Sequence, residues 1–256
     1  MSLLENKVAI VTGAGQGVGR GIALALAAEG ARVMLMGRTE AKLLAVGQEF
    51  AGRGATAATV VGDVKSRAEI ERCVQATVDA FGGIDILVNN AQEVALGHLL
   101  ELDDDAVNAG WESGPLAALR FMRACHPYLK AHDGKPGGVI INVASGAGVR
   151  PDPVRRGAYA AVKEAMRAFT SAAAVEWGRD GIRVNAILPY ATSPALEQLA
   201  REYPEEYEAR LGQVPLGRIG DPELDVGRGV VMLVSDHGSY VTGATIPLEG
   251  GISFVG

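Results

Sequence analysis

A tyrosine and a lysine four residues apart are the side chains of this sequence best suited to move a proton. Tyr159 and Lys163 lie in an alanine-rich stretch of helical period, so their spacing places both on one face of a helix. A phenol with a pKa of ~10 exchanges protons poorly at neutral pH, and a neighbouring ammonium should lower that pKa. Upstream, Ser145 follows an apolar run ending at Val143, which predicts a hydroxyl at the carboxyl end of a strand, where open parallel sheets bind ligands.

A glycine-rich turn between the first apolar run and the first helical stretch predicts a binding site for a diphosphate. The glycines follow the pattern Gly13-x-x-x-Gly17-x-Gly19, with Gln16 and Val18 between them. Glycine permits a tight turn and lets backbone N–H groups approach an anion, and the start of the following helix adds partial positive charge. The expected ligand is a dinucleotide.

The end of the second apolar run indicates which dinucleotide. A carboxylate about 20 residues beyond the glycines would bind a free ribose 2′-hydroxyl, but the sequence there is Met36-Gly37-Arg38. The guanidinium of Arg38 is suited to a 2′-phosphate, which favours NADP(H) over NAD(H). The alternative interpretation of Arg38 is a surface charge at a helix start.

Short apolar runs alternate with helical stretches along the whole chain. This alternation predicts an α/β fold in which one doubly wound domain, residues 1–256, holds a seven-stranded parallel sheet with helices on both faces. Strands are expected at 8–11, 32–36, 57–61, 86–88, 138–143, 183–188 and 245–248, and helices at 18–29, 40–52, 66–81, 101–131, 157–177 and 222–235. The proline- and glutamate-rich segment 189–221 lies outside the rhythm, and is either a substrate lid or a solvated helix with an acidic face.

Composition narrows the function classes. A hydrophobic fraction of 48% excludes disorder, and a net charge of −6 argues against a nucleic-acid partner. No apolar run reaches the ~18 residues that cross a membrane, and no leader is evident, so we expect a cytoplasmic protein. Two cysteines are too few for a disulfide framework, and the four histidines lack ligand spacing, so no catalytic metal is expected.

Taken in order, these motifs resemble the short-chain dehydrogenase/reductase family over nearly the whole chain. Asp63-Val64, Asn89-Asn90-Ala91 and Val241-Thr242-Gly243 complete the resemblance. It implies a Rossmann fold and hydride transfer between NADP(H) and a ketone or secondary alcohol.

The resemblance also implies roles for individual residues. Tyr159 would be the general acid/base, Lys163 would hold the nicotinamide ribose and lower the tyrosine pKa, and Ser145 would hydrogen-bond the substrate oxygen. Asp63 and Val64 would contact the adenine, and Asn90 and Ala91 the ribose on the nicotinamide side. The implied cofactor-binding set is Gly13, Gln16, Gly17, Val18, Gly19, Arg38, Asp63, Val64, Asn90, Ala91, Tyr159, Lys163 and Thr192.

Three departures from the family pattern stand out. Gln92 follows Asn-Asn-Ala where the family has glycine, and Gly114 stands where the family has a catalytic asparagine. A water would then take the place of the missing amide, and Pro115 predicts a kink or break in the helix. Tyr190 replaces the glycine of a Pro-Gly pair. These changes leave open a dinucleotide-binding protein with weak or lost redox activity, acting as a sensor or partner.

In the family the substrate is oriented by segments that correspond to 92–100, 146–156 and 190–215. Here they are mainly apolar, which favours an apolar ketone or alcohol, with Gln92, Val149 and Tyr190 as substrate contacts. The other side chains considered there are Val94, His98, Pro151 and Val154. A homotetramer, or a homodimer, is implied through the helices expected near 112–131 and 157–177.

Overall fold

Seven parallel strands form one sheet in the order β3-β2-β1-β4-β5-β6-β7. The computed structural model describes residues 2–132, 134–150 and 155–253. Each expected strand is present, and the expected and observed ends differ by one residue at most. The strands are β1 (Val8–Thr12), β2 (Arg32–Gly37), β3 (Ala57–Val61), β4 (Ile86–Asn89), β5 (Val139–Val143), β6 (Arg183–Pro189) and β7 (Thr245–Leu248).

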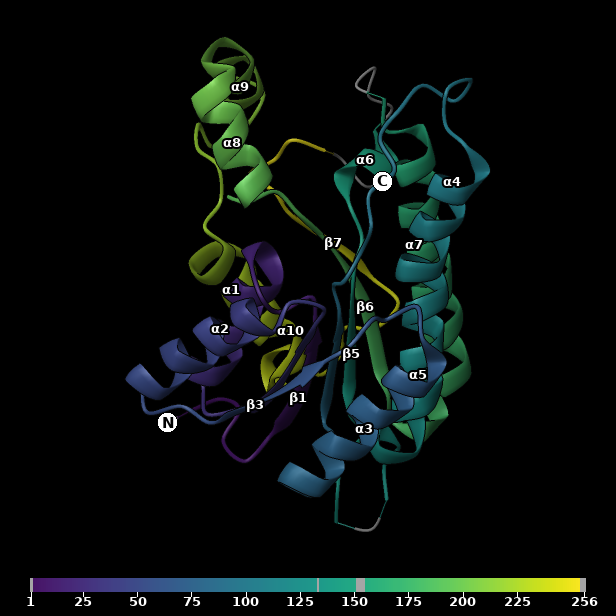
Figure 1. Cartoon of the computed structure of the whole chain (residues 1–256). Helices are drawn as coiled ribbons and strands as arrows, with labels where there is room; N and C mark the ends of the chain where they lie inside the picture. The colour runs from purple at the N-terminus through teal and green to yellow at the C-terminus, as the bar shows by residue number, and fades with distance from the viewer. Residues whose placement is uncertain (1, 133, 151–154, 254–256) are drawn as a thin grey trace.

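Helices cover both faces of the sheet, which makes the fold doubly wound (Figure 1). One face carries α1 (Gly17–Ala28), α2 (Glu40–Gly52) and α10 (Arg228–Val234). The other carries α3 (Arg67–Phe81), α5 (Ala117–Leu129) and α7 (Gly157–Trp177). This architecture confirms the α/β fold that the alternating pattern predicts.

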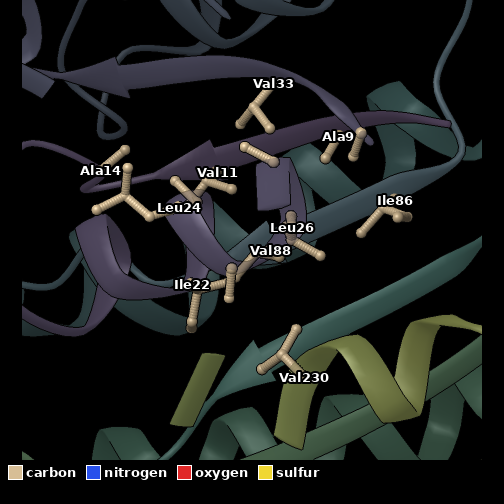
Figure 2. Close-up of a cluster of buried hydrophobic side chains, with 14 of the residues drawn as sticks. Ala9, Val11, Ala14, Ile22, Leu24, Leu26, Val33, Ile86, Val88 and Val230 are labelled. Atoms are coloured by element: carbon tan, nitrogen blue, oxygen red, sulfur yellow. The ribbon is translucent and has the colours of Figure 1, made fainter. Parts of the chain in front are cut away.

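Burial on both sides explains why the strands are continuously apolar rather than alternating. In β1, Ala9 and Val11 pack with α1 and α10, whereas Ile10 between them packs with α3 and α5 on the opposite face. Figure 2 shows the first of these clusters, where Ile22 and Leu26 of α1 lie among the strand side chains. The strand ends are thereby held rigidly, and the loops that follow them carry the polar residues.

The helix expected over 101–131 is three segments, because its middle cannot continue an α-helix. α4 (Asp104–Trp111) passes into a π-helical turn, η1 (Glu112–Leu116), before α5 begins. Pro115 inside the turn lacks the N–H that an α-helix needs. The break that the Gly114-Pro115 pair predicts is therefore present, in the form of a π-turn.

The segment 189–221 folds as two short helices, α8 (Pro194–Glu202) and α9 (Pro204–Leu211), that stand away from the sheet above α1 (Figure 1). Ser193 caps α8 by accepting the N–H of Leu196, the one buried side chain of that helix. The glutamates of both helices are exposed, as a solvated acidic face requires. A lid function for this segment stays a prediction.

Candidate active site

A cavity of about 360 Å³ opens at the carboxyl ends of β1, β2 and β4. This is the point where the strand order reverses, because β1 pairs with β2 on one side and with β4 on the other. Ligands of open parallel sheets bind at such switch points. The cavity is lined by Gly13, Gly15, Gln16, Gly17, Val18, Gly19, Gly37, Arg38, Thr39, Lys42, Leu43, Gly62, Asp63, Val64, Asn90, Ala91, Gln92, Glu93, Ser113, Ser193 and Pro194.

The glycine-rich turn forms one wall of this cavity in a conformation that requires glycine. Gly13 and Gly17 have φ values of +65° and +53°, in the left-handed region. Gly19 packs so closely that a Cβ there would overlap Asn90 Nδ2 and the Gly13 carbonyl. Asn90 holds the turn, since its Nδ2 donates to the carbonyls of Thr12 at 2.9 Å and Gly13 at 3.2 Å. Asn90 therefore shapes the turn from within.

The start of α1 faces the cavity with its backbone donors free of a side-chain cap. Gln16 precedes the helix and makes no capping hydrogen bond, and the first turn of α1 holds no acidic residue. Uncapped N–H groups at a positive helix end, beside glycines without side chains, are suited to a diphosphate. The residues present thus fit the dinucleotide that the sequence predicts.

A cluster of charges lies at the end of the cavity where β2 and β3 finish. Arg38 Nη1 lies 2.5 Å from Glu93 Oε1, and Lys65 Nζ lies 3.0 Å from the same oxygen. The hydrogen bond to Glu93 raises the pKa of Lys65. Asp63 also lines the cavity, and its Oδ1 accepts the backbone N–H of Lys65 at 2.9 Å. No sequence motif predicts a role for Glu93. Its carboxylate pairs with the guanidinium of Arg38, the group expected to bind a 2′-phosphate.

The three proton-transfer candidates come together at the carboxyl end of β5. Ser145 caps the short helix α6 (Gly146–Val149), and its side chain hydrogen-bonds Tyr159. Lys163 Nζ donates to the Val143 carbonyl at 2.6 Å and lies 5.6 Å from the centre of the Tyr159 ring. The phenol and the ammonium lie on one face of α7, as their spacing predicts.

The protonation of this trio differs from the expectation in one respect. Burial raises the pKa of Tyr159, and the hydrogen bond from Ser145 and the charge of Arg156 oppose that shift only in part. Burial also lowers the pKa of Lys163 to about 7. The lysine thus loses part of the charge that was expected to lower the tyrosine pKa, and burial has the larger effect.

A buried chain of polar side chains fixes α7 against the sheet. Asn89 Nδ2 donates to Asn142 Oδ1 at 2.8 Å, and Asn142 Nδ2 donates to Thr170 Oγ1 at 2.9 Å. These bonds join the ends of β4 and β5 to the helix two turns beyond Lys163. Hydrogen-bonded buried amides favour one packing arrangement, so these bonds position the helix that carries Tyr159.

The space above Gly114 is filled by a protein side chain, which corrects the expectation of a water there. A Cβ at Gly114 would overlap Gln92 Oε1, because the Gln92 carboxamide lies directly over this glycine. Gln92 also adopts no left-handed backbone conformation, so the loss of the family glycine carries no strain at this position.

Three further predicted residues lie elsewhere. The Thr192 hydroxyl donates to the Gly220 carbonyl at 3.4 Å, and the neighbouring Ser193 and Pro194 line the cavity in its place. Val149 packs against the small cluster around Met166, and Tyr190 lines a second cavity of about 450 Å³ beside Leu216. Pro151 and Val154 lie outside the described residues. Lys42, Thr39 and Ser113 also reach the main cavity, although no sequence motif marks them.

The described ranges hold neither a metal-binding cluster nor a membrane-spanning helix. Among residues 2–132, 134–150 and 155–253, His, Cys, Asp and Glu side chains form no group of three able to hold a metal ion. No helix within these ranges is long and apolar enough to cross a membrane.

Comparison with known proteins identifies the family. Residues 13–253 match the family model described as enoyl-(acyl carrier protein) reductase. The chain is 43% identical to a 12alpha-hydroxysteroid dehydrogenase of a Clostridium species, over 98% of both proteins. It is 36% identical to a galactitol 2-dehydrogenase (L-tagatose-forming) of Cereibacter sphaeroides, over 97% of this chain and 95% of that one.

Solved structures agree with the sequence relatives. A short-chain dehydrogenase from Burkholderia cenocepacia in complex with NADP superposes with a TM-score of 0.89 at 28% identity, covering 98% of this chain and 99% of that one. A short-chain dehydrogenase/reductase from Burkholderia xenovorans gives a TM-score of 0.91 at 30% identity, with 98% of each chain covered. The chain belongs to the short-chain dehydrogenase/reductase family, and is an oxidoreductase of that family.

Proposed function

We propose that this protein transfers a hydride between NADP(H) and a ketone or secondary alcohol on an apolar substrate, with Tyr159 as the general acid/base. The observation that carries the proposal is the contact of Tyr159 with Ser145 and Lys163 at the carboxyl end of β5. A strand end beside the switch-point cavity is where a substrate would meet the cofactor. The trio is intact despite the departures at Gln92 and Gly114, which favours an active enzyme over a sensor.

The chemistry divides between the cofactor and the trio. The nicotinamide, when bound, supplies or accepts the hydride. Tyr159 donates its phenolic proton to the carbonyl oxygen during reduction, and takes it back from the alcohol during oxidation. Ser145 donates a hydrogen bond to the same substrate oxygen and stabilises the negative charge that develops on it. Because burial raises the pKa of Tyr159, the phenol is protonated at neutral pH and is ready to act as the acid.

Lys163, with its pKa lowered to about 7 by burial, holds a partly charged amine close to the phenol. Its Nζ is anchored on the Val143 carbonyl, so the ammonium is held near the Tyr159 ring rather than exposed to solvent. The charged form of the lysine stabilises the phenolate that Tyr159 becomes once its proton has left. We also propose that Lys163 binds the ribose on the nicotinamide side of the cofactor.

The cofactor preference rests on the cations at the far end of the cavity. Arg38, Lys42 and Lys65 all lie at or near this end, and none of them is buried. A 2′-phosphate would replace or share the carboxylate of Glu93 on Arg38. A member of the family solved in complex with NADP supports this choice.

The substrate class follows from two lines of support. Val94, Leu96 and Leu99 are exposed apolar side chains in the loop after β4, one of the segments expected to orient the substrate. The Clostridium relative at 43% identity is a hydroxysteroid dehydrogenase. We therefore propose a hydroxysteroid or a similarly apolar secondary alcohol.

A cofactor and substrate screen tests the proposal. Purified protein is mixed with NADPH and ketones, or with NADP and alcohols, in panels that include hydroxysteroids and sugar alcohols, and the absorbance of the reduced nicotinamide is followed. The proposal predicts turnover that is fastest with an apolar secondary alcohol or its ketone. Tight cofactor binding without turnover of any panel member would favour the sensor instead.

The assembly and location form part of the same proposal. We propose a cytoplasmic homotetramer, or a homodimer, that pairs through α5 and α7. Val175 on α7 is 83% exposed, as expected for an apolar side chain that a second copy covers. Size-exclusion chromatography with light scattering tests this, and a monomer at micromolar concentration would contradict it.

A further inference from the structure

The π-turn η1 carries a notch that a side chain from another segment fills. At Gly114 a Cβ would overlap Gln92 Oε1 and would lie 2.8 Å from its Cδ and 2.9 Å from its Nε2. The carboxamide of Gln92 therefore lies against the glycine, with Oε1 nearest to it. Any larger residue at position 114 would displace it.

The carboxamide is also hydrogen-bonded into the break of the helix. Gln92 Nε2 donates to the carbonyls of Glu93 and Gly110, both at 2.8 Å. Ser113 Oγ accepts the N–H of Glu93 at 2.9 Å and donates to the Ala109 carbonyl at 2.7 Å. A π-turn shifts the backbone hydrogen bonds by one residue. The Gly110 carbonyl at the end of α4 accepts a hydrogen bond from the Gln92 side chain. The loop after β4 is thus joined to the end of α4 by the Gln92 amide and to the π-turn by the Ser113 hydroxyl.

The other half of the amide is buried without a partner. Gln92 Oε1 is fully shielded and accepts no hydrogen bond from any residue that the structure describes. Leaving a buried acceptor unpaired is unfavourable, so the donors of the same amide must compensate for it. A thioether of the same length would avoid that cost, which indicates that the amide is kept for what its donors hold in place.

The π-turn lies between the cavity and the helix that carries the proton-transfer residues. Ser113 of the turn and Gln92 both line the cofactor cavity. The turn also packs against α7, on which Tyr159 and Lys163 lie. A shift of the turn would therefore move both the cavity wall and the helix behind it.

We propose that Gln92 is a positioning residue, whose carboxamide fills the Gly114 notch and fixes the π-turn that supports the phenol and the ammonium beside the cavity. Its catalytic consequence rests on the proposed function, whereas its effect on the π-turn does not. Gln92 and Gly114 form a matched pair, in which one position supplies the amide and the other supplies the room for it.

A swap of the amide across the notch tests the pairing. Gln92→Met keeps the length but removes the donors, and Gln92→Gly empties the notch. Gly114→Asn alone places a second amide where one already lies. The double variant Gln92→Gly/Gly114→Asn offers one amide again, from the other side. Gln75→Met is the matched control, because that exposed amide on α3 bonds Asp79 and does not line the cavity.

Two readouts separate positioning from a general loss of stability. Hydrogen exchange followed by mass spectrometry reports the protection of residues 110–117 and of the start of α7. Turnover per NADPH-binding site, measured well below the melting temperature, reports kcat and KM separately. We expect Gln92→Met and Gly114→Asn to speed exchange in both segments and to lower kcat by about tenfold, with KM for the carbonyl within about twofold. The double variant should recover protection and kcat to within about threefold of the parent, and Gln75→Met should match the parent.

Contradicting results are equally defined. The proposal is overturned if Gln92→Met leaves exchange in 110–117 unchanged, or if the effects of Gln92→Gly and Gly114→Asn simply add in the double variant. It is also overturned if exchange responds as expected while kcat per site does not change. If the parent itself turns over no substrate, the proposed function fails, and the exchange measurements alone still decide whether Gln92 holds the π-turn.

Discussion

Replacement of Arg38 by alanine should weaken the binding of NADPH far more than that of NADH. Arg38 is the one guanidinium that lines the cavity among the residues described, and its side chain is 62% exposed. A hydrogen bond to a charged group contributes ~1.5–3 kcal/mol, and solvent exposure places this one at the lower end. A loss of ~1.5 kcal/mol corresponds to about tenfold in Kd. NADH has no 2′-phosphate, so its Kd should stay within about twofold.

Removal of the competing carboxylate should have the opposite effect. Glu93 pairs with Arg38 and Lys65 through one oxygen, and a 2′-phosphate must compete for the same cations. An exposed ion pair contributes ~0.2–1 kcal/mol, so Glu93→Gln should tighten NADPH binding by up to about fivefold. The gain should shrink as salt is added, because screening weakens both the pair and the phosphate contact.

Both variants are measured by titrating the fluorescence of the reduced nicotinamide at low and moderate ionic strength. Arg53→Ala is the matched control, since Arg53 is an arginine paired with Glu223 outside the cavity. The reasoning is refuted if Arg38→Ala weakens NADH and NADPH equally, or if Glu93→Gln weakens NADPH. Either result would mean that the cation at the end of β2 does not face the ribose.

Three further predictions concern stability. Arg218 lowers the pKa of Asp225 to about 2 through a hydrogen bond, so Asp225→Asn should lower the free energy of unfolding by ~1 kcal/mol at pH 7. That difference is present above the unfolded pKa of ~3.9 and should vanish as the pH falls through about 2 in acid-unfolding curves. Burial lowers the pKa of Lys163 to about 7 from an unfolded value of ~10.4, so its cost is greatest below pH 7 and vanishes above the unfolded pKa. Lys163→Met should therefore abolish turnover but stabilise the fold. The gain in the free energy of unfolding, measured with urea, should be ~2 kcal/mol larger at pH 6 than at pH 10. An equal gain at the two pH values would contradict this. Gly19→Ala should cost ~2 kcal/mol, because its methyl group overlaps Asn90 Nδ2, and an unchanged urea midpoint would show that the turn can yield.

Much of the fold follows from local patterns. Continuous apolar runs such as Val8–Val11 predict strands buried on both faces, and glycine at positions 13 and 17 predicts the left-handed turn that the structure contains. The spacing of Tyr159 and Lys163 predicts one helix face, because helical geometry alone decides it. Each of these features depends on residues within a few positions of one another.

The missed features depend on contacts between distant segments. Glu93 meets Arg38 across 55 positions of sequence, and nothing near either residue indicates the other. Gln92 contacts Gly114, 22 positions further along the chain, so two departures from the family pattern that look independent in sequence are one contact in space. The raised pKa of Tyr159 likewise comes from burial, which no spacing reports. Local rules thus locate the reactive side chains, whereas their electrostatics require the packed structure.

The most direct test of the central claim is the turnover of Tyr159→Phe. Phenylalanine keeps the ring and its packing but removes the hydroxyl that hydrogen-bonds Ser145. With the best substrate of the screen, kcat should fall by about 10²–10⁴-fold, while the Kd for NADPH stays within about twofold of the parent. A Tyr159→Phe variant that turns over within about fivefold of the parent would show that another group carries the proton.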